Sequence, residues 1–371
     1  MTNQQYHLSK SESTLIPVTL LTGFLGSGKT SVLNHLVCQP EMSDALVIIN
    51  EFGEMALDHE LVAHSTENLV MEMSSGCVCC SIRGDLVQTL RDITWRYVRN
   101  GKRWFQRVLI ETTGLADPAP IIHTLITHLQ IARKYKLDGI VSTVDAATGI
   151  NTMNQYQEAV KQAAMADILL LTKADLVTKD QYDVILNRLD KINPAAPRFE
   201  VINGEITAQK VLNLGLFNAE DKTPNVKRWL KQEAYSESES HEHNLEHNHK
   251  HHNHSAHDSH DDHHHDISRH DDYIRAFCFT IEQPIPENIL TDWLELLKDF
   301  VGSKILRVKG ILNIEGKENP LALHGVQHIF HPTAPLPGWT NEDHRSKLVF
   351  ITYGVSRNVI EKTFNIFGKY E

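Results

Sequence analysis

The sequence predicts an α/β fold built on a mostly parallel sheet, followed by a small α+β domain. Apolar runs of strand length alternate with helical patterns between residues 18 and 171, which is typical of βαβ units. A glycine-rich turn joins the first strand to the first helix. Beyond residue 273, apolar residues alternate with polar ones, as in a half-exposed sheet. We expect domains at 1–228 and 273–371, joined by a linker at 229–272.

The expected elements follow from apolar spacing and length. In the first domain the strands lie at 18–21, 45–50, 69–73, 108–110, 140–144 and 168–171, with helices at 31–37, 81–97 and 156–165. In the second domain the strands lie at 274–281, 304–314, 321–330 and 348–352, with helices at 289–300 and 355–367. Ligands of parallel sheets bind at the carboxyl ends of the strands, so we expect the functional residues there.

Composition excludes several classes of function. The chain has 371 residues, and its polar start and lack of long apolar runs predict a cytoplasmic protein without membrane contact. The net charge is −11, of which residues 233–272 contribute −9, so the folded parts are nearly neutral. No basic patch indicates nucleic-acid binding.

Residues 241–270 contain 13 of the 23 histidines and almost no apolar residues. Such a segment cannot bury enough surface to offset its ordering entropy, which predicts a disordered linker. Its imidazoles could bind Zn²⁺ or Ni²⁺ as a buffer, or they could be incidental to a linker of low complexity.

The motif that organises the first domain is G-x-x-x-x-G-K-T at residues 23–30. It lies between a strand and a helix, which is the context of a P-loop. Backbone N–H groups of such a loop face a β-phosphate, Lys29 would reach the β- and γ-phosphates, and the Thr30 hydroxyl would ligate Mg²⁺. The sequence predicts a nucleoside triphosphate site made of Gly23, Gly26, Ser27, Gly28, Lys29, Thr30 and Ser31.

Glu111 follows the strand at 108–110, and Gly114 follows it three residues later. An acid at this strand end can help to hold Mg²⁺, and a glycine N–H at this spacing can contact a γ-phosphate. The common GTPase pattern is D-x-x-G, whereas this chain has E-x-x-G. In the alternative interpretation Glu111 only caps the next helix.

Thr172-Lys173-Ala174-Asp175 follows the strand at 168–171. GTPases carry N-K-x-D after such a strand, where the Asp accepts hydrogen bonds from guanine and the Lys stem lies across the base. Lys173 and Asp175 match this pattern, and Thr172 replaces Asn. The motif favours GTP over ATP.

Cys77, Cys79 and Cys80 lie within four residues, before the helix at 81–97. Thiolates are soft ligands that suit Zn²⁺, and three of them leave one tetrahedral position open for exchange. Buried unreactive cysteines or a redox pair are the alternatives. Glu54 and His128 are candidates for additional ligands.

These segments occur together in the order seen in CobW-like GTPases, which the chain resembles. The resemblance rests on the P-loop, the segments 50–54, 76–80, 111–118 and 172–175, and the second-domain segments 306–310 and 323–327. It implies a P-loop GTPase fold and a GTP-dependent zinc chaperone that transfers metal from C-x-C-C to a client metalloenzyme.

The sequence therefore predicts a slow GTPase that uses GTP, Mg²⁺ and Zn²⁺ and is accelerated by metal or by its client. One alternative is a zinc buffer that acts through the histidine segment 241–270. Another is a cobalt-handling GTPase of cobalamin synthesis, a function that the family also contains. A small-molecule kinase is disfavoured because no acceptor site or lid is evident.

Overall fold

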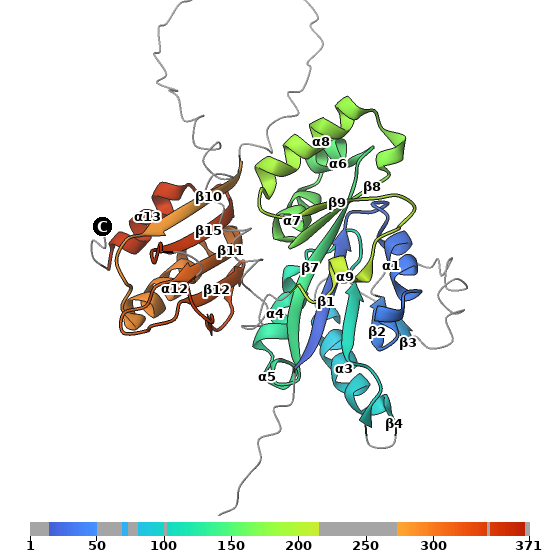
Figure 1. Ribbon diagram of the computed structural model, residues 1–371, viewed down its shortest axis with the longest axis horizontal. Coiled ribbons are helices and arrows are strands. Elements are labelled where there is room, and N and C mark those ends of the chain that lie inside the picture. The colour runs from blue at the N-terminus through green and yellow to red at the C-terminus, as the bar shows by residue number, and fades with distance from the viewer. Residues whose placement is uncertain are drawn as a thin grey trace, which may run out of the picture.

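The computed structural model describes residues 15–49, 69–72, 81–99, 102–214, 273–339 and 342–367. Within these ranges the chain forms two large sheets, each with its own helices, that lie side by side (Figure 1). The predicted fold class, a P-loop-type parallel sheet followed by an α+β domain, is confirmed.

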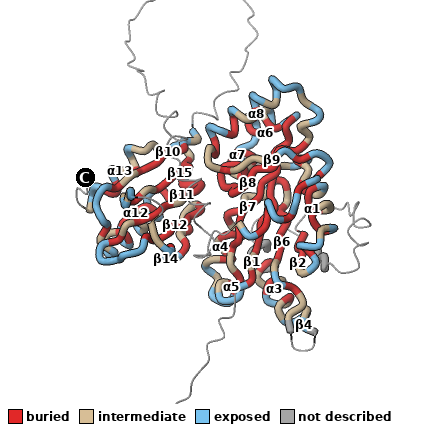
Figure 2. Tube along the Cα trace, viewed as in Figure 1, coloured by how far each residue is buried: buried red, intermediate tan, exposed pale blue. Residues whose placement is uncertain are grey.

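The first sheet has seven strands, all paired in parallel. Their spatial order is β3 (Leu69–Glu72), β2 (Ala45–Ile49), β6 (Arg107–Glu111), β1 (Ile16–Gly23), β7 (Tyr135–Asp145), β8 (Ile168–Thr172) and β9 (Arg198–Val201). All residues of β2 and β8 are buried, because helices cover both faces of the sheet (Figure 2).

Alternate residues of each strand face different helices, since side chains point to opposite faces of a sheet. Leu46 and Ile48 of β2 pack with the helices α3 (Ser81–Arg96), α4 (Ala119–Thr127) and α5 (Leu129–Ala132). Val47 and Ile49 pack instead with α1 (Lys29–Val37) and α9 (Ala208–Val211). The remaining described elements are η1 (Pro40–Met42), α6 (Gly149–Gln155), α7 (Gln157–Met165), η2 (Ala174–Leu176), α8 (Lys179–Ile192) and the hairpin β4 (Val98–Arg99) and β5 (Lys102–Arg103).

The second domain has an antiparallel sheet in the order β10 (Ile274–Ile281), β15 (Ser346–Tyr353), β11 (Ile305–Leu312), β12 (Leu321–Val326) and β13 (Ile329–Phe330). The short β14 (Ala334–Pro335) also pairs with β12. The helices α12 (Glu287–Val301) and α13 (Arg357–Asn365) cover one face around the fully buried Trp293, and η5 (Gly302–Lys304) follows α12.

The other face of this sheet packs on the first domain, so the prediction of a half-exposed sheet was wrong. Cys278, Leu306 and Val349 join one apolar cluster with residues of α7 and α8. Because these outward-facing positions are apolar too, the sheet needs a cover on both faces.

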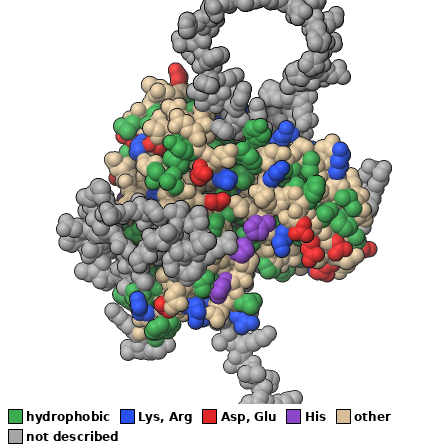
Figure 3. Space-filling view, turned by 180° about the vertical axis from the view of Figure 1, so that it is seen from behind, with side chains coloured by type: hydrophobic (Ala, Val, Ile, Leu, Met, Phe, Trp, Pro, Cys, Tyr) green, Lys and Arg blue, Asp and Glu red, His purple; other side chains and the backbone are tan. Residues whose placement is uncertain are grey.

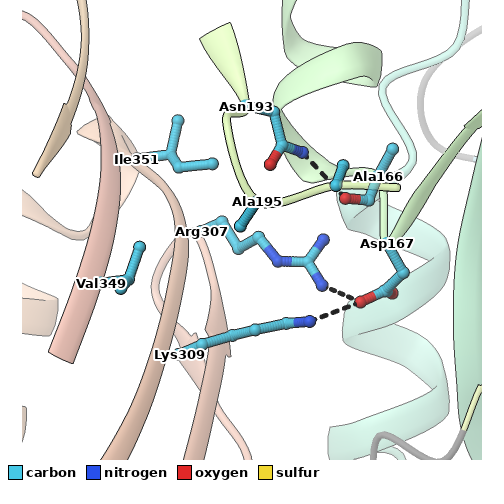
Figure 4. A pocket seen from close by; sticks show the side chains of 9 residues that line it. Ala166, Asp167, Asn193, Ala195, Arg307, Lys309, Val349 and Ile351 are labelled. Carbon is cyan, nitrogen blue, oxygen red and sulfur yellow. Dashed lines mark hydrogen bonds and ion pairs between the residues drawn. The ribbon is translucent and has the colours of Figure 1, made fainter. Parts of the chain in front are cut away.

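A buried ion pair network also crosses this contact (Figure 4). Asp167, just before β8, accepts hydrogen bonds from Arg307 and from Lys309 Nζ, the latter at 2.8 Å. Burial raises the pKa of the Asp167 carboxyl, but the two cations lower it more, so it lies below its ordinary value. The two domains are therefore held together by both apolar packing and charge.

The structure differs from the prediction at three strands. β7 begins at Tyr135, earlier than predicted. The polar residues Tyr135 and Asp138 interrupt the apolar run in the sequence, but both can be buried in the strand because Tyr135 donates to Leu90 O and Asp138 accepts from Thr19 Oγ1. β9 lies at the sheet edge and lacks an apolar run. The predicted strand 321–330 is a hairpin that turns at Gln327, whose φ is +52°.

No helix among the described residues is long and apolar enough to cross a membrane. On the face turned away from the view of Figure 1, Lys and Arg side chains are scattered rather than gathered in one patch (Figure 3).

Candidate functional site

The P-loop lies between β1 and α1, at the carboxyl end of the sheet (Figure 1). Gly23 has φ +142°, and a Cβ there would lie 2.1 Å from Thr143 Oγ1 of β7, so only glycine fits. Gly26 and Gly28 also have positive φ angles, of +71° and +86°. The loop therefore curls tightly above the start of α1, whose first N–H groups form an anion site.

Side chains of the P-loop form hydrogen bonds with the loop backbone and with β7. Ser27 Oγ lies 2.6 Å from Thr143 Oγ1 and donates to Phe24 O. Lys29 is 7% exposed, and its Nζ donates to Phe24 O at 3.2 Å. The Lys29 ammonium thus lies against the loop that would enclose the phosphates.

Thr30 Oγ1 lies 3.3 Å from Glu111 Oε1, and Glu111 is 2% exposed at the end of β6. Hydroxyl and carboxylate oxygens are hard donors of the kind that Mg²⁺ prefers, so this pair fits the metal ion of a nucleotide. Glu111 does not cap α4, because Asp117 Oδ1 accepts the hydrogen bond from Ala119 N at 2.9 Å.

Gly114 lies directly against the P-loop. A Cβ at Gly114 would be 2.6 Å from Leu25 N, which is closer than any side chain allows. The backbone of the segment after β6 therefore lies against the P-loop at Gly114.

The T-K-x-D segment lies beside the P-loop, at the end of β8. Thr172 Oγ1 donates to Ser27 O at 2.8 Å, and Lys173 Nζ donates to Gly26 O at 2.8 Å. Lys173 has φ +55°, and Asp175 is exposed. The hydroxyl of Thr172 thus joins the two loops directly. The Asn of the usual N-K-x-D motif also carries a hydrogen-bond donor, so Thr can replace it in this contact.

Asp145, at the end of β7, was not predicted as a site residue. Its Oδ2 lies 2.6 Å from Lys173 Nζ, and its Oδ1 accepts from the N–H groups of Ala147 and Thr148. Burial raises the pKa of Asp145, but the bonds from Lys173 and the two backbone donors lower it below its ordinary value. The only sequence signal was an acid at a strand end.

Comparisons with known proteins agree with this geometry. The sequence profile of the CobW/HypB/UreG nucleotide-binding domain matches residues 17–200, and that of the cobalamin synthesis protein cobW C-terminal domain matches 274–367. The chain is 31% identical to the zinc chaperone YjiA of Escherichia coli, over 94% of this chain and 98% of YjiA. It belongs to the CobW/HypB/UreG family.

One further relative and a crystal structure of YjiA itself also span most of the chain. The zinc chaperone CobW of Pseudomonas aeruginosa is 29% identical, over 91% of this chain and 87% of its own length. The crystal structure of Zn(II)-bound YjiA GTPase from E. coli is similar with a TM-score of 0.65 at 26% identity, covering 96% of this chain and 99% of that one.

The other predicted ligands of this CobW/HypB/UreG family member are not brought together by the described residues. Cys77, Cys79, Cys80 and Glu54 lie outside the described ranges, as does the histidine segment 241–270. His128 follows α4, a nine-residue helix about 14 Å long that begins at Ala119, after the γ-phosphate end of the proposed site. The described residues contain no group of three or more His, Cys, Asp or Glu that could hold a metal ion.

Proposed function

We propose that this chain is a GTP-hydrolysing zinc chaperone that delivers metal from its C-x-C-C motif to a client metalloprotein. The observation that carries the GTP assignment is the direct bonding of Thr172 and Lys173 to Ser27 O and Gly26 O of the P-loop. This bonding holds the T-K-x-D segment, which is proposed to bind the base, next to the loop that is proposed to bind the phosphates. The relatives YjiA and CobW are zinc chaperones, which supports zinc as the cargo.

We assign the nucleotide roles to these residues. The P-loop amides and Lys29 hold the phosphates, and Gly114 N–H contacts the γ-phosphate. Asp175 accepts hydrogen bonds from the guanine N–H groups, and the Lys173 stem covers the ring. Thr30 and Glu111 would hold Mg²⁺, which supplies neutralising charge at the phosphate oxygens when bound.

Zinc is the cargo, and Cys77, Cys79 and Cys80 are its proposed ligands. The helix α3 begins at Ser81, directly after them, so its positive end would favour their thiolate forms. We assign Glu54 and His128 as candidates for additional ligands. Since clustered thiols persist in a reducing compartment, the proposed location is the cytoplasm.

The proposed domains are 1–228 and 273–371, with 229–272 as linker. The client is proposed to be a zinc-dependent metalloenzyme. Intrinsic hydrolysis is proposed to be slow and to be accelerated by metal or client, as in GTPases that act as switches.

Zinc affinity tests this function when it is measured with a non-hydrolysable GTP analogue and again with GDP. A change of at least tenfold between the two nucleotides is expected, because nucleotide and metal can be coupled only through differential binding. Equal affinities would remove the chaperone cycle.

The 13 histidines at 241–270 favour a second candidate, a zinc buffer that does not need GTP. Deleting residues 241–270 discriminates between the two functions. A buffer loses its tight zinc binding with this deletion and keeps it in the Cys77→Ala, Cys79→Ala, Cys80→Ala variant. A chaperone gives the opposite pair of results.

A further inference from the structure

Two glutamines contact the segment 111–118, which we call the γ-phosphate segment, from outside the nucleotide site. Gln162 comes from α7, and Gln327 comes from the second domain. Neither residue has a role in the proposed nucleotide contacts. Gln327 belongs to the segment 323–327, one of the two motifs of the second domain that the proposed function leaves without a task.

Gln162 fixes the backbone of the γ-phosphate segment. Its Nε2 donates to Gly114 O at 3.1 Å and to Ala116 O at 2.9 Å, and the residue is 1% exposed. Because both partners are carbonyl oxygens, which only accept hydrogen bonds, the amide atom of Gln162 that faces them is the nitrogen and not the oxygen. Because both donors are used on residues two apart, the backbone between them has little freedom to rotate.

Gln327 fixes the end of the same segment. Its Nε2 donates to Asp117 Oδ2 at 3.1 Å, while Asp117 Oδ1 accepts from Ala119 N at the start of α4. Lys161 Nζ lies 3.8 Å from the same carboxylate. The Asp117 side chain therefore links the second domain, the γ-phosphate segment and α4.

The turn that presents Gln327 is rigid and closely packed. It is the two-residue connection between β12 and β13, and Gln327 adopts a left-handed φ of +52°, which is uncommon for this residue type. The next residue, His328, packs against Gly302, where a Cβ would lie 2.8 Å from the His328 Cβ. Its ring also lies 5.6 Å from that of His123 on α4.

The helix that carries Gln162 is held by the second domain as well. Arg307 of β11 donates to Met165 O at the end of α7 and to Asp167 just beyond it (Figure 4). Arg307 and Lys309 belong to the other motif of the second domain without an assigned task, 306–310. Gln327 therefore belongs to the second domain, and the helix that carries Gln162 is bonded to that domain.

We propose that the second domain pre-organises the γ-phosphate segment, with Gln162 and Gln327 as positioning residues that favour triphosphate over diphosphate. This inference rests on the proposed GTPase function. A segment that is ordered before binding loses less conformational entropy when it closes on the γ-phosphate. GDP has no γ-phosphate and gains nothing from this order. By reciprocity, GTP strengthens the contact between the domains by the same factor.

The test uses the full chain with Gln327→Asn. Asparagine tolerates the left-handed turn better than glutamine does but is one methylene shorter, so the turn is kept and the bond to Asp117 is lost. Affinities are measured for fluorescent GDP and for a fluorescent non-hydrolysable GTP analogue. We expect the analogue to bind about fivefold more weakly and GDP to change less than twofold.

A matched control removes a different hydrogen bond between the domains. Tyr353→Phe deletes the hydroxyl that accepts from Gln157 Nε2 at 2.9 Å, at the first residue of α7. We expect both nucleotides to bind this variant as they bind the wild type. Gln162→Leu should lower the affinity for the analogue by at least as much as Gln327→Asn, and thermal unfolding reports whether it is folded.

Equal losses for both nucleotides with Gln327→Asn would show a merely structural role and overturn the inference. Unchanged affinities of Gln327→Asn for both nucleotides would overturn it as well. So would a shift in the ratio of the two affinities that is equally large with Tyr353→Phe. A wild type that binds neither nucleotide would instead remove the proposed GTPase function, and this inference with it.

Discussion

The two ends of the nucleotide site are built differently. At the base end, Thr172 and Lys173 bond to the P-loop and to Asp145, and all of these residues belong to the first domain. At the γ-phosphate end, the segment 111–118 is bonded by Gln162 and by Gln327, one of which comes from the second domain. The proposed base recognition is thus complete within one domain, whereas the proposed triphosphate recognition depends on how the two domains are packed.

The difference has a physical cause. The base-end contacts join loops that follow β1, β7 and β8, three consecutive strands of the parallel sheet, so the sheet itself brings them together. The segment after β6, the strand on the other side of β1, lies against the P-loop at Gly114, and Gln162 and Gln327 bond to it from outside the sheet. Changes in domain packing should therefore alter the GTP-to-GDP preference before they alter the guanine preference.

The largest effect is expected at the point that both ends share. Lys29→Ala removes the cation that neutralises the phosphates, and we expect GTP hydrolysis to fall by about 1,000-fold or more. Single-turnover hydrolysis measures this. Lys298→Ala, at an exposed position of α12, is the control and should leave the rate unchanged. A rate within tenfold of the wild type would place the phosphates elsewhere.

At the base end, Asp175→Asn should weaken GTP and GDP equally, by about 100-fold, because two hydrogen bonds to a charged acceptor are lost. Competition between GTP and ITP measures the preference, since inosine lacks the exocyclic amine that Asp175 is assigned to bind. The wild type should prefer GTP, and the variant should discriminate far less. A preference kept intact by the variant would contradict the guanine assignment.

Low pH is expected to lower the folding stability through His331 of the second domain. Burial lowers the pKa of His331 to about 3, although Asp167 opposes the shift, while the unfolded chain has an ordinary value of about 6.5. The unfolded state therefore binds more protons below pH 6.5, and stability falls as the pH falls. Between pH 7 and 5 the free energy of unfolding should drop by about 2 kcal/mol.

Urea unfolding at the two pH values measures this loss. His331→Asn removes the titrating group, so the variant should lose less stability between pH 7 and 5 than the wild type does. An equal loss in both proteins would assign the acid sensitivity to other groups.

A smaller effect is expected where the two loops of the base end meet. Thr172→Val deletes the hydroxyl that bonds to Ser27 O and leaves that carbonyl unpaired in a buried position, so both nucleotides should bind about tenfold more weakly. Thr172→Asn restores a donor and should bind both within about twofold of the wild type. A changed ratio of GTP to GDP affinity in Thr172→Val would contradict the assignment of triphosphate preference to the γ-phosphate end alone.

Much of the site could be predicted because its residues are local in sequence. Gly26, Gly28 and Lys29 lie in one short motif, and their backbone angles follow from that motif alone. Lys173 and Asp175 were predicted in the same way, from one short motif. Asp145 was missed because a lone acid at a strand end has no distinguishing neighbours, although it forms an ion pair with Lys173.

The contacts of the second domain could not be predicted by the same reasoning. Gln327 and Asp117 are 210 residues apart, and Arg307 and Asp167 are 140 apart. Polar residues in such contacts have the same character as exposed surface residues until the fold buries them. The alternation that predicted a half-exposed sheet failed for a related reason, since Cys278 and Val349 meet α7 and α8 only after the domains pack.

By itself, the sequence determined the strand–loop–helix of the P-loop, the acid and glycine after β6, the T-K-x-D segment and the class of fold. Each depends on interactions within a few residues or on the period of a single element. Only the tertiary structure decided that Thr172 bonds to the P-loop and that Gln162 and Gln327 hold the γ-phosphate segment. These contacts join residues distant in the chain, and the packing of sheets and domains alone sets which of them meet.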